Sequence, residues 1–269
     1  MLSVLAFRPV PAVATSTVPP GYWLVGADGG VFAYGGAAYL GSTGGVPLNA
    51  PVTGMASTPS HAGYWLVAAD GGVFSFGDAP FFGSLGATKV GSPIVAMAST
   101  RDGRGYWLVS RAGEVFSFGD ASVAGPAVGR LTSPAVAIVA DRSADGYRVG
   151  GRNGEIISFA APELGWTTDL PVVGMAATAN GGWWAVSRAG AVANSGFAGA
   201  SQSPVVDDLG SVTFKLRAPV VAIAGTPDDR GYYVFASDGG VFTFGDAVFC
   251  GSRVGVPLNA PIVGGTTAS

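Results

Sequence analysis

A three-residue step, glycine followed by two aromatic residues, recurs along the chain and constrains its fold more than any other feature. Its copies begin at Gly21, Gly63, Gly105, Gly146, Gly182 and Gly231, and the copy at Gly146 is broken. The spacing is about 42 residues and ranges from 36 to 49, the length typical of one blade of a β-propeller. Because the repeat runs nearly end to end, we expect one all-β domain, a single β-propeller over residues 21–269. Its blades should start near residues 21, 63, 105, 146, 182 and 231.

The best-preserved copies predict four short strands per blade. In the second copy these are expected around 51–58, 63–67, 73–77 and 81–84. The first is rich in small residues, as the crowded position nearest the axis requires. In the second strand, Tyr64 and Leu66 point to one face and Trp65 and Val67 to the other, so both faces should be covered by neighbouring blades. The Asp70-Gly71 step that follows predicts a hairpin turn.

The ends of the chain bear on how the ring closes. There are six hairpins but seven copies of the small inner strand, the first at 10–16 and the last at 261–267. We expect six four-stranded blades, with the C-terminal strand pairing beside 21–27 to remove the open sheet edges. Residues 1–20 are then a surplus inner strand or a weak signal-like region. A seven-bladed ring is the alternative, although its last blade would lack a hairpin.

Composition argues against several classes of partner. With 14 Lys and Arg against 17 Asp and Glu, the net charge is −3, which leaves no basic stripe for nucleic acid. No apolar run approaches the roughly 20 residues of a transmembrane helix. Cys250 is the one cysteine and His61 the one histidine. The sequence therefore predicts no disulfide, no metal site, no cofactor and no catalytic constellation.

Three units also carry a resemblance to a known repeat. The stretches from Gly63 to Ser84, Gly105 to Ala121 and Gly231 to Ser252 resemble the GYWLVASDGGVFSFGDA repeat of secreted and cell-surface proteins of actinobacteria. The resemblance implies a β-propeller in an extracellular or cell-surface location that serves as a binding module. It supplies no active-site residues.

Departures from the repeat are the candidates for a specific site, because the scaffold does not require them. Arg148 stands where other copies have Trp or Tyr, and a longer, irregular stretch follows the fifth hairpin. Loops of a propeller commonly carry ligand contacts. The alternative is drift, with Arg148 paired to Glu155 or to a neighbouring carboxylate. The candidate ligand-binding residues are Arg148, Arg152, Glu155, Glu163, Trp166, Asp207, Lys215 and Arg217.

The function favoured by these observations is a non-catalytic binding or interaction module. Its ligand would be a protein or a glycan, including cell-wall glycans, at one face of the propeller. Most aromatic residues lie in strands that should be buried, so packing explains their number, and Trp166 alone is expected to be exposed outside the repeat. One alternative is a propeller hydrolase with a site in the central channel, and another is a structural subunit of a larger assembly. The oligomeric state is left open by the sequence.

Overall fold

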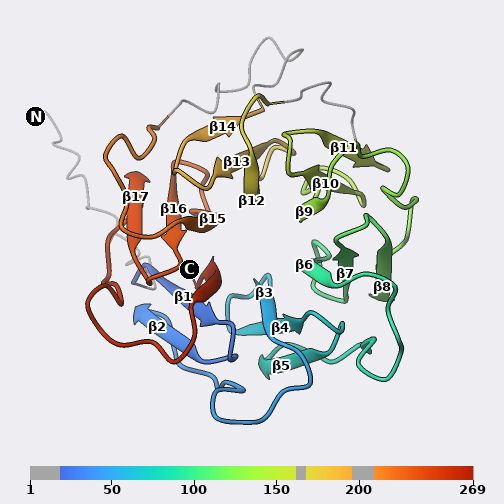
Figure 1. The fold of residues 1–269 in the computed structure, drawn as a ribbon, viewed down its shortest axis with the longest axis horizontal. Helices are drawn as coiled ribbons and strands as arrows, with labels where there is room; N and C mark the ends of the chain where they lie inside the picture. Colours follow the sequence, from blue (N-terminus) through green and yellow to red (C-terminus); the bar gives the residue numbers. More distant parts are fainter. Residues whose placement is uncertain (1–18, 162–167, 196–208, 269) are drawn as a thin grey trace, which may run out of the picture.

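The computed structural model describes residues 19–161, 168–195 and 209–268. Over these residues the protein is all-β and contains no helix. The strands form six antiparallel sheets of three strands each. Figure 1 shows the sheets standing around a central axis in a propeller-like arrangement, with one strand of each sheet nearest the axis.

Each sheet consists of an inner, a second and an outer strand. We number the sheets 1 to 6 along the chain as β18-β1-β2, β3-β4-β5, β6-β7-β8, β9-β10-β11, β12-β13-β14 and β15-β16-β17. The inner strands are β3 (Val52–Ser57), β6 (Ile94–Ser99), β9 (Ala135–Ala140), β12 (Val172–Ala177), β15 (Val220–Gly225) and β18 (Ile262–Thr267). The second strands are β1 (Gly21–Gly26), β4 (Gly63–Ala68), β7 (Gly105–Ser110), β10 (Tyr147–Gly151), β13 (Trp183–Ser187) and β16 (Gly231–Ala236). The outer strands are β2 (Val31–Gly35), β5 (Val73–Gly77), β8 (Val115–Gly119), β11 (Ile156–Phe159), β14 (Val192–Asn194) and β17 (Val241–Gly245).

Small residues allow the inner strands to meet around the axis. Each inner strand contacts the next in a cycle that runs from β3 to β18 and back to β3. The third residue of every inner strand is Gly or Ala. A Cβ added at Gly174 would lie 3.2 Å from the Cα of Ala222, and one at Gly264 would lie 3.5 Å from the Cα of Gly54. The small residues expected near the axis therefore fit the close approach of neighbouring inner strands, which is tightest at Gly174.

Sheet 1 joins the two ends of the described chain. Strand β18 pairs antiparallel with β1, so that Thr267 lies opposite Tyr22. The Ala268 amide continues the pairing by donating to the Gly21 carbonyl at 2.9 Å. The C-terminal strand thus occupies the inner position of sheet 1, as the sequence predicts. Residues 1–18, the larger part of the proposed surplus strand or signal-like region, lie outside the described residues.

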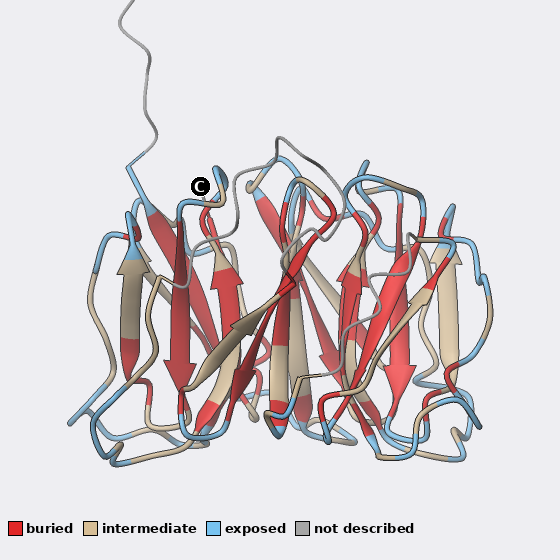
Figure 2. Ribbon diagram, turned by 90° about the horizontal axis from the view of Figure 1, so that it is seen from above, coloured by how far each residue is buried: buried red, intermediate tan, exposed pale blue. Residues whose placement is uncertain are grey.

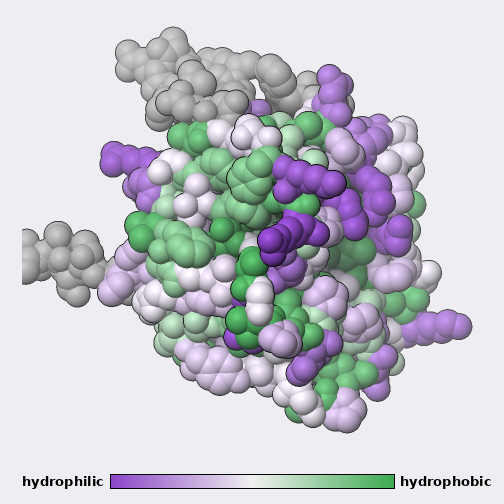
Figure 3. Space-filling view, turned by 60° about the vertical axis from the view of Figure 1, so that its left-hand side comes forward, coloured by the Kyte–Doolittle hydropathy of each residue, from purple (hydrophilic) through white to green (hydrophobic). Residues whose placement is uncertain are grey.

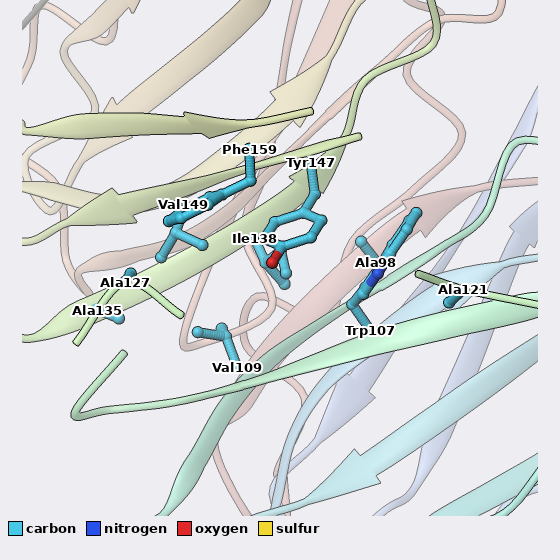
Figure 4. Packing of buried hydrophobic residues seen from close by; sticks show 10 residues of the cluster. All are labelled: Ala98, Trp107, Val109, Ala121, Ala127, Ala135, Ile138, Tyr147, Val149 and Phe159. Atoms are coloured by element: carbon cyan, nitrogen blue, oxygen red, sulfur yellow. The ribbon is translucent and has the colours of Figure 1, made fainter. Parts of the chain in front are cut away.

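The second strands form the buried layer between neighbouring sheets. Figure 2 shows them as buried, with outer strands of intermediate burial beside them. The predicted alternation is confirmed: Trp65 and Val67 pack against the next sheet, while Tyr64 and Leu66 pack against the previous one. Figure 4 shows the same packing between sheets 3 and 4. There the ring centroid of Tyr147 lies 5.3 Å from that of Trp107.

A tyrosine hydroxyl links most of the neighbouring sheets. In five junctions, the tyrosine that opens the second strand donates to a glycine carbonyl in the segment after the outer strand of the preceding sheet. These pairs are Tyr64 to Gly41, Tyr106 to Gly83, Tyr147 to Gly125, Tyr232 to Gly210 and, from the last sheet to the first, Tyr22 to Gly251. The glycines have positive φ, and a Cβ at Gly83 would lie 2.8 Å from the Phe118 ring. At the remaining junction, between sheets 4 and 5, Trp183 takes the tyrosine position.

The expected fourth strand is absent from the described parts of the sheets, and side chains explain its absence. In sheet 2, residues 80–84 follow β5 without strand pairing. The Pro80 carbonyl accepts from Trp65 Nε1 at 2.8 Å, and the Gly83 carbonyl accepts from Tyr106 Oη at 2.5 Å. Since side chains take these backbone acceptors, no strand ladder is needed to satisfy them. The sheets therefore have three strands where the sequence analysis predicts four.

The tyrosine link can be tested by removing one hydroxyl. We expect Tyr106→Phe to lower the free energy of unfolding by about 1–3 kcal/mol, because the half-buried Gly83 carbonyl loses its donor. Tyr39→Phe is the matched control, since its hydroxyl is exposed and bonds to the exposed side of Ser42 within the same segment. Urea denaturation of both variants measures the difference. Equal stability of the two variants would contradict a role for the link.

Burial of these tyrosines also predicts how stability changes at high pH. Desolvation raises the pKa of Tyr22 and of Tyr64 from 10.0 to about 12. The unfolded chain therefore releases these protons at lower pH than the folded protein does. Stability should stay constant up to about pH 10 and fall between pH 10 and 12. Denaturation midpoints measured from pH 8 to 12 test this, and Tyr64→Phe should show a shallower fall over that interval.

Candidate binding surfaces

Arg148, the break in the repeat, lies in the interior of the ring. In β10 it pairs with Val139 of the inner strand and Ser158 of the outer strand. Its Nη2 lies 2.6 Å from Oδ2 of Asp141, and both side chains are at most 1% exposed. Arg148 therefore belongs to a buried ion pair and not to an exposed ligand surface. Asp141 is its ion-pair partner among the described residues, where the sequence analysis names Glu155 or a neighbouring carboxylate.

Two departures from the repeat coincide in this ion pair. The Asp141 amide donates to the Gly146 carbonyl at 2.9 Å, and the Thr58 and Thr100 amides make the same bond in sheets 2 and 3. Asp141 thus replaces a threonine in the one copy where Arg replaces the second aromatic residue. Its Oδ1 also accepts from the amide and hydroxyl of Ser143 at 2.7 and 2.6 Å. These bonds supply the partners that a buried carboxylate needs.

The other predicted site residues do not converge on one surface. Arg152 is exposed in the β10–β11 turn, and the Glu155 carboxylate accepts from the Thr132 hydroxyl and amide at 2.7 and 2.8 Å. These bonds lower the pKa of Glu155. Lys215 and Arg217 are exposed before β15, in a segment whose Val212 amide donates to the Gly190 carbonyl of the β13–β14 turn. Glu163, Trp166 and Asp207 lie outside the described residues.

The six inner strands enclose a central cavity of about 540 Å³. One end is lined by the second residue of each inner strand, which is Thr53 in β3 and valine in the other five. Farther along, Met97, Ile138, Met175 and Ile223 are among the lining residues. Ser57, Ser99 and Thr266 add hydroxyls toward the opposite end, where the Ser57 and Thr266 hydroxyls lie 3.2 Å apart. The cavity therefore changes from apolar to polar along the axis.

Loops between inner and second strands form the polar end, which we call the arginine mouth. These loops span residues 58–62, 100–104, 141–146, 178–182 and 226–230. Arg101 and Arg142 occupy the second position of two neighbouring loops, in sheets 3 and 4, and both line the cavity. Sequence analysis missed these two arginines. The signal that could have revealed them is their departure from the other copies, which have Pro59, Ala179 and Pro227 at this position.

Two residues with positive φ connect loops at the arginine mouth. His61 and Asp229 have φ of 56° and 60°, where two other copies have Gly103 and Gly181. His61 Nδ1 lies 3.2 Å from the Thr267 carbonyl, and Asp229 Oδ2 accepts from the Ala179 amide at 2.5 Å. Burial raises the pKa of Asp229, while the Ala179 amide and the charge of Arg142 oppose the shift. His61 is half-buried and connects two sheets, and does not project freely into solvent.

A second surface lies at the outer edge of the ring. We call the segments 38–42, 80–84, 122–126 and 248–252, each of which follows an outer strand, the rim segments. Each exposes an apolar side chain at its second position: Tyr39 (62%), Phe81 (60%), Val123 (46%) and Phe249 (56%). In the last segment Val248 is exposed as well. Figure 3, viewed toward the side that carries β17 and β2, shows hydrophobic surface in separate patches. Exposed aromatic residues thus occur within the repeat, and not only outside it as predicted.

Side chains from two sheets hold the rim segments in place. In sheet 1, the Ala38 carbonyl accepts from Trp23 Nε1 at 2.8 Å, and the Gly41 carbonyl accepts from Tyr64 of sheet 2 at 2.5 Å. Tyr39 projects between these two bonds. The same pair of bonds flanks Phe81 in sheet 2 and Val123 in sheet 3. The exposed side chains are therefore displayed from restrained backbone.

Comparison with known proteins does not assign either surface. No family model matches the chain, and no curated protein matches its sequence. Among the described residues, no group of three or more His, Cys, Asp or Glu side chains is placed to hold a metal ion. The same residues include no helix long and apolar enough to cross a membrane.

The buried ion pair can be tested by restoring the usual residues of the repeat. We expect Asp141→Thr alone to lower the free energy of unfolding by about 3–5 kcal/mol, because it removes one partner of a buried ion pair. The double variant Asp141→Thr/Arg148→Trp should be more stable than Asp141→Thr, since it recreates the pair found in sheets 2 and 3. A double-mutant cycle by urea denaturation measures the coupling. Strictly additive effects would contradict the compensation.

Proposed function

We propose that this chain is a six-bladed β-propeller that acts as a non-catalytic binding module, and that its rim segments bind a glycan. The single observation that carries the proposal is the repeated display of Tyr39, Phe81 and Phe249 from equivalent, restrained segments. One exposed apolar side chain needs no explanation. Recurrence at the same position in three sheets indicates a common use.

The chemistry around each exposed ring suits a neutral sugar. No charged residue occurs in the rim segments, so an uncharged ligand meets no unpaired charge. A serine follows each ring by three residues, as Ser42, Ser84 and Ser252. An aromatic face packs on the C–H face of a sugar, and a nearby hydroxyl exchanges hydrogen bonds with sugar hydroxyls. In sheet 1 the two groups are close, because Tyr39 Oη lies 3.1 Å from Ser42 Oγ.

Sheet 3 supports the pairing of ring and hydroxyl. There Val123 replaces the aromatic residue and Pro126 replaces the serine. Both groups are lost together, although the backbone bonds that hold the segment are kept. The scaffold therefore does not require either group, which favours a joint role in binding.

The distribution of the rings favours a polymer over a single compact ligand. They lie on three different sheets at the periphery of the ring, and single aromatic side chains bind sugars weakly. Several equivalent weak sites gain affinity together when the ligand repeats. The restrained rim backbone further limits the entropy lost on binding. A polysaccharide has both the repetition and the chemistry.

The lining of the cavity supports the non-catalytic form of the proposal. Hydrolysis by general acid and base needs ionisable groups that face a common point. Among the described lining residues, the ionisable side chains are His61, Arg101 and Arg142, and no carboxylate is present. We therefore rank a binding module above a propeller hydrolase.

An extracellular or cell-surface location is part of the same proposal. It rests on the resemblance of the repeat to secreted actinobacterial proteins, and it agrees with a cell-wall glycan as ligand. Fractionation of the native organism tests it directly. Recovery of the chain only in the cytosolic fraction would contradict this location.

Cosedimentation with insoluble polysaccharides tests the ligand class. We expect the full chain to be retained by at least one of peptidoglycan, chitin and cellulose. The triple variant Tyr39→Ala/Phe81→Ala/Phe249→Ala should lose at least about tenfold in apparent affinity, as loss of several equivalent sites implies. Val123→Ala is the matched control and should bind like the unmodified chain. These exposed changes should each alter stability by less than about 0.5 kcal/mol.

Two outcomes would contradict the glycan proposal. One is no retention on any of the three polysaccharides. The other is equal retention of the triple variant and of the unmodified chain, with melting curves showing that both are folded.

A further inference from the structure

The arginine mouth carries two cations that the repeat does not need. Arg101 follows the buried Thr100, and Arg142 follows the buried Asp141, so both have the same place in neighbouring loops. Sheets 2 and 6 have proline at this position and sheet 5 has alanine. Closure and packing of the ring therefore do not depend on a guanidinium there.

Neither cation is used in an ion pair within the described residues. Arg104 and Arg230 lie 3.8 Å from the carboxylates of Asp102 and Asp228 in their own loops. Arg101 and Arg142 have no such contact within 4 Å in the same part of the chain, although the charge of Arg142 acts on Asp229. Both arginines are exposed at the mouth, so their planar donor groups can reach a ligand.

The cavity beneath them has the size of a small-molecule site. Its volume of about 540 Å³ lies within the range of about 300–1,000 Å³ common for ligand pockets. Met55 and the valines of the inner strands provide the more accessible apolar lining, while Met97, Ile138 and Met175 line the cavity but are at most 9% exposed because they also pack between the sheets. His61 also lines the cavity, and its Nδ1 faces the Thr267 carbonyl. The loops of the mouth further contain Asp145, Asp229, which accepts from the Ala179 amide, and the pairs Asp102–Arg104 and Asp228–Arg230.

We propose that the central cavity binds a small organic anion. Its oxyanion group would accept hydrogen bonds from Arg101 and Arg142, because a guanidinium presents paired donors that match carboxylate, phosphate or sulfonate oxygens. Its apolar body would contact Met55 and the valine side chains of the inner strands. This site is separate from the rim segments and does not depend on glycan binding there.

Two related dyes test the charge requirement. Anilinonaphthalene sulfonate carries an anion on an apolar body, and N-phenyl-1-naphthylamine has a similar body without the charge. We expect the sulfonate to saturate one site per chain and to bind at least about tenfold more tightly than the neutral dye. Arg101→Gln and Arg142→Gln should each weaken sulfonate binding about tenfold, equivalent to about 1.4 kcal/mol. Arg104→Gln is the matched control, since Arg104 shares a loop with Arg101 but does not line the cavity.

Methionine methyl spectra locate the bound dye. Met55, Met97 and Met175 all line the cavity, so their ¹³C-methyl signals should shift together on addition of the sulfonate. Three results would overturn the proposal: equal affinity for the two dyes, an equal loss in Arg104→Gln, or unshifted cavity methionines in the presence of bound dye. Loss of the dye signal in Phe81→Ala would likewise overturn it by placing the dye at the rim.

Discussion

The hydrogen bond from a buried tyrosine to a glycine carbonyl of the preceding sheet is the interaction on which the arrangement most depends. Stacked sheets could slide past one another if apolar contact alone held them, because burial of apolar area has little directional preference. The tyrosine link is directional. It connects the second strand of one sheet to a glycine of the preceding sheet. The positive φ of this glycine, Gly41 in the first sheet, lets its backbone lie against an aromatic ring of the following sheet, Phe76. The same bond from Tyr22 to Gly251 places the last sheet against the first.

This link also explains how much of the fold the sequence predicts. The period, the hairpin turns and the alternation of Tyr64 and Trp65 follow from local pattern, because each depends on residues close together in the chain. The Asp70 turn has the expected form, with Oδ1 of Asp70 accepting from the Gly72 amide at 2.9 Å. The missing fourth strand could not be predicted in this way. Whether residues 80–84 form a strand depends on Trp65 and Tyr106, which reach their backbone carbonyls from two different sheets.

The candidate site residues likewise divide into those that the sequence marks and those that it does not. Arg148 is conspicuous as a departure from the repeat, but a single position cannot reveal whether a charge is exposed or paired. Comparing positions 141 and 148 together would have indicated an ion pair, because Asp141 replaces threonine in the same copy in which Arg148 replaces an aromatic residue. Arg101 and Arg142 escape notice for the opposite reason: they lie in loops that vary between copies, so no template marks them. Their common place at the cavity becomes apparent only when the loops are brought together around the axis.

Pairing of β18 with β1 has a consequence for where the chain can begin and end. Sheet 1 is assembled from both termini of the described region, and the Ala268 amide meets the Gly21 carbonyl. Because the remaining five sheets are each continuous in sequence, sheet 1 is where the ring gains or loses its closure. A linker between residues 268 and 21 would make sheet 1 continuous in sequence. New termini in another exposed loop would then make a different sheet the one that closes the ring. The sheet at which the chain begins could thus be changed while the sheets keep the same order around the axis.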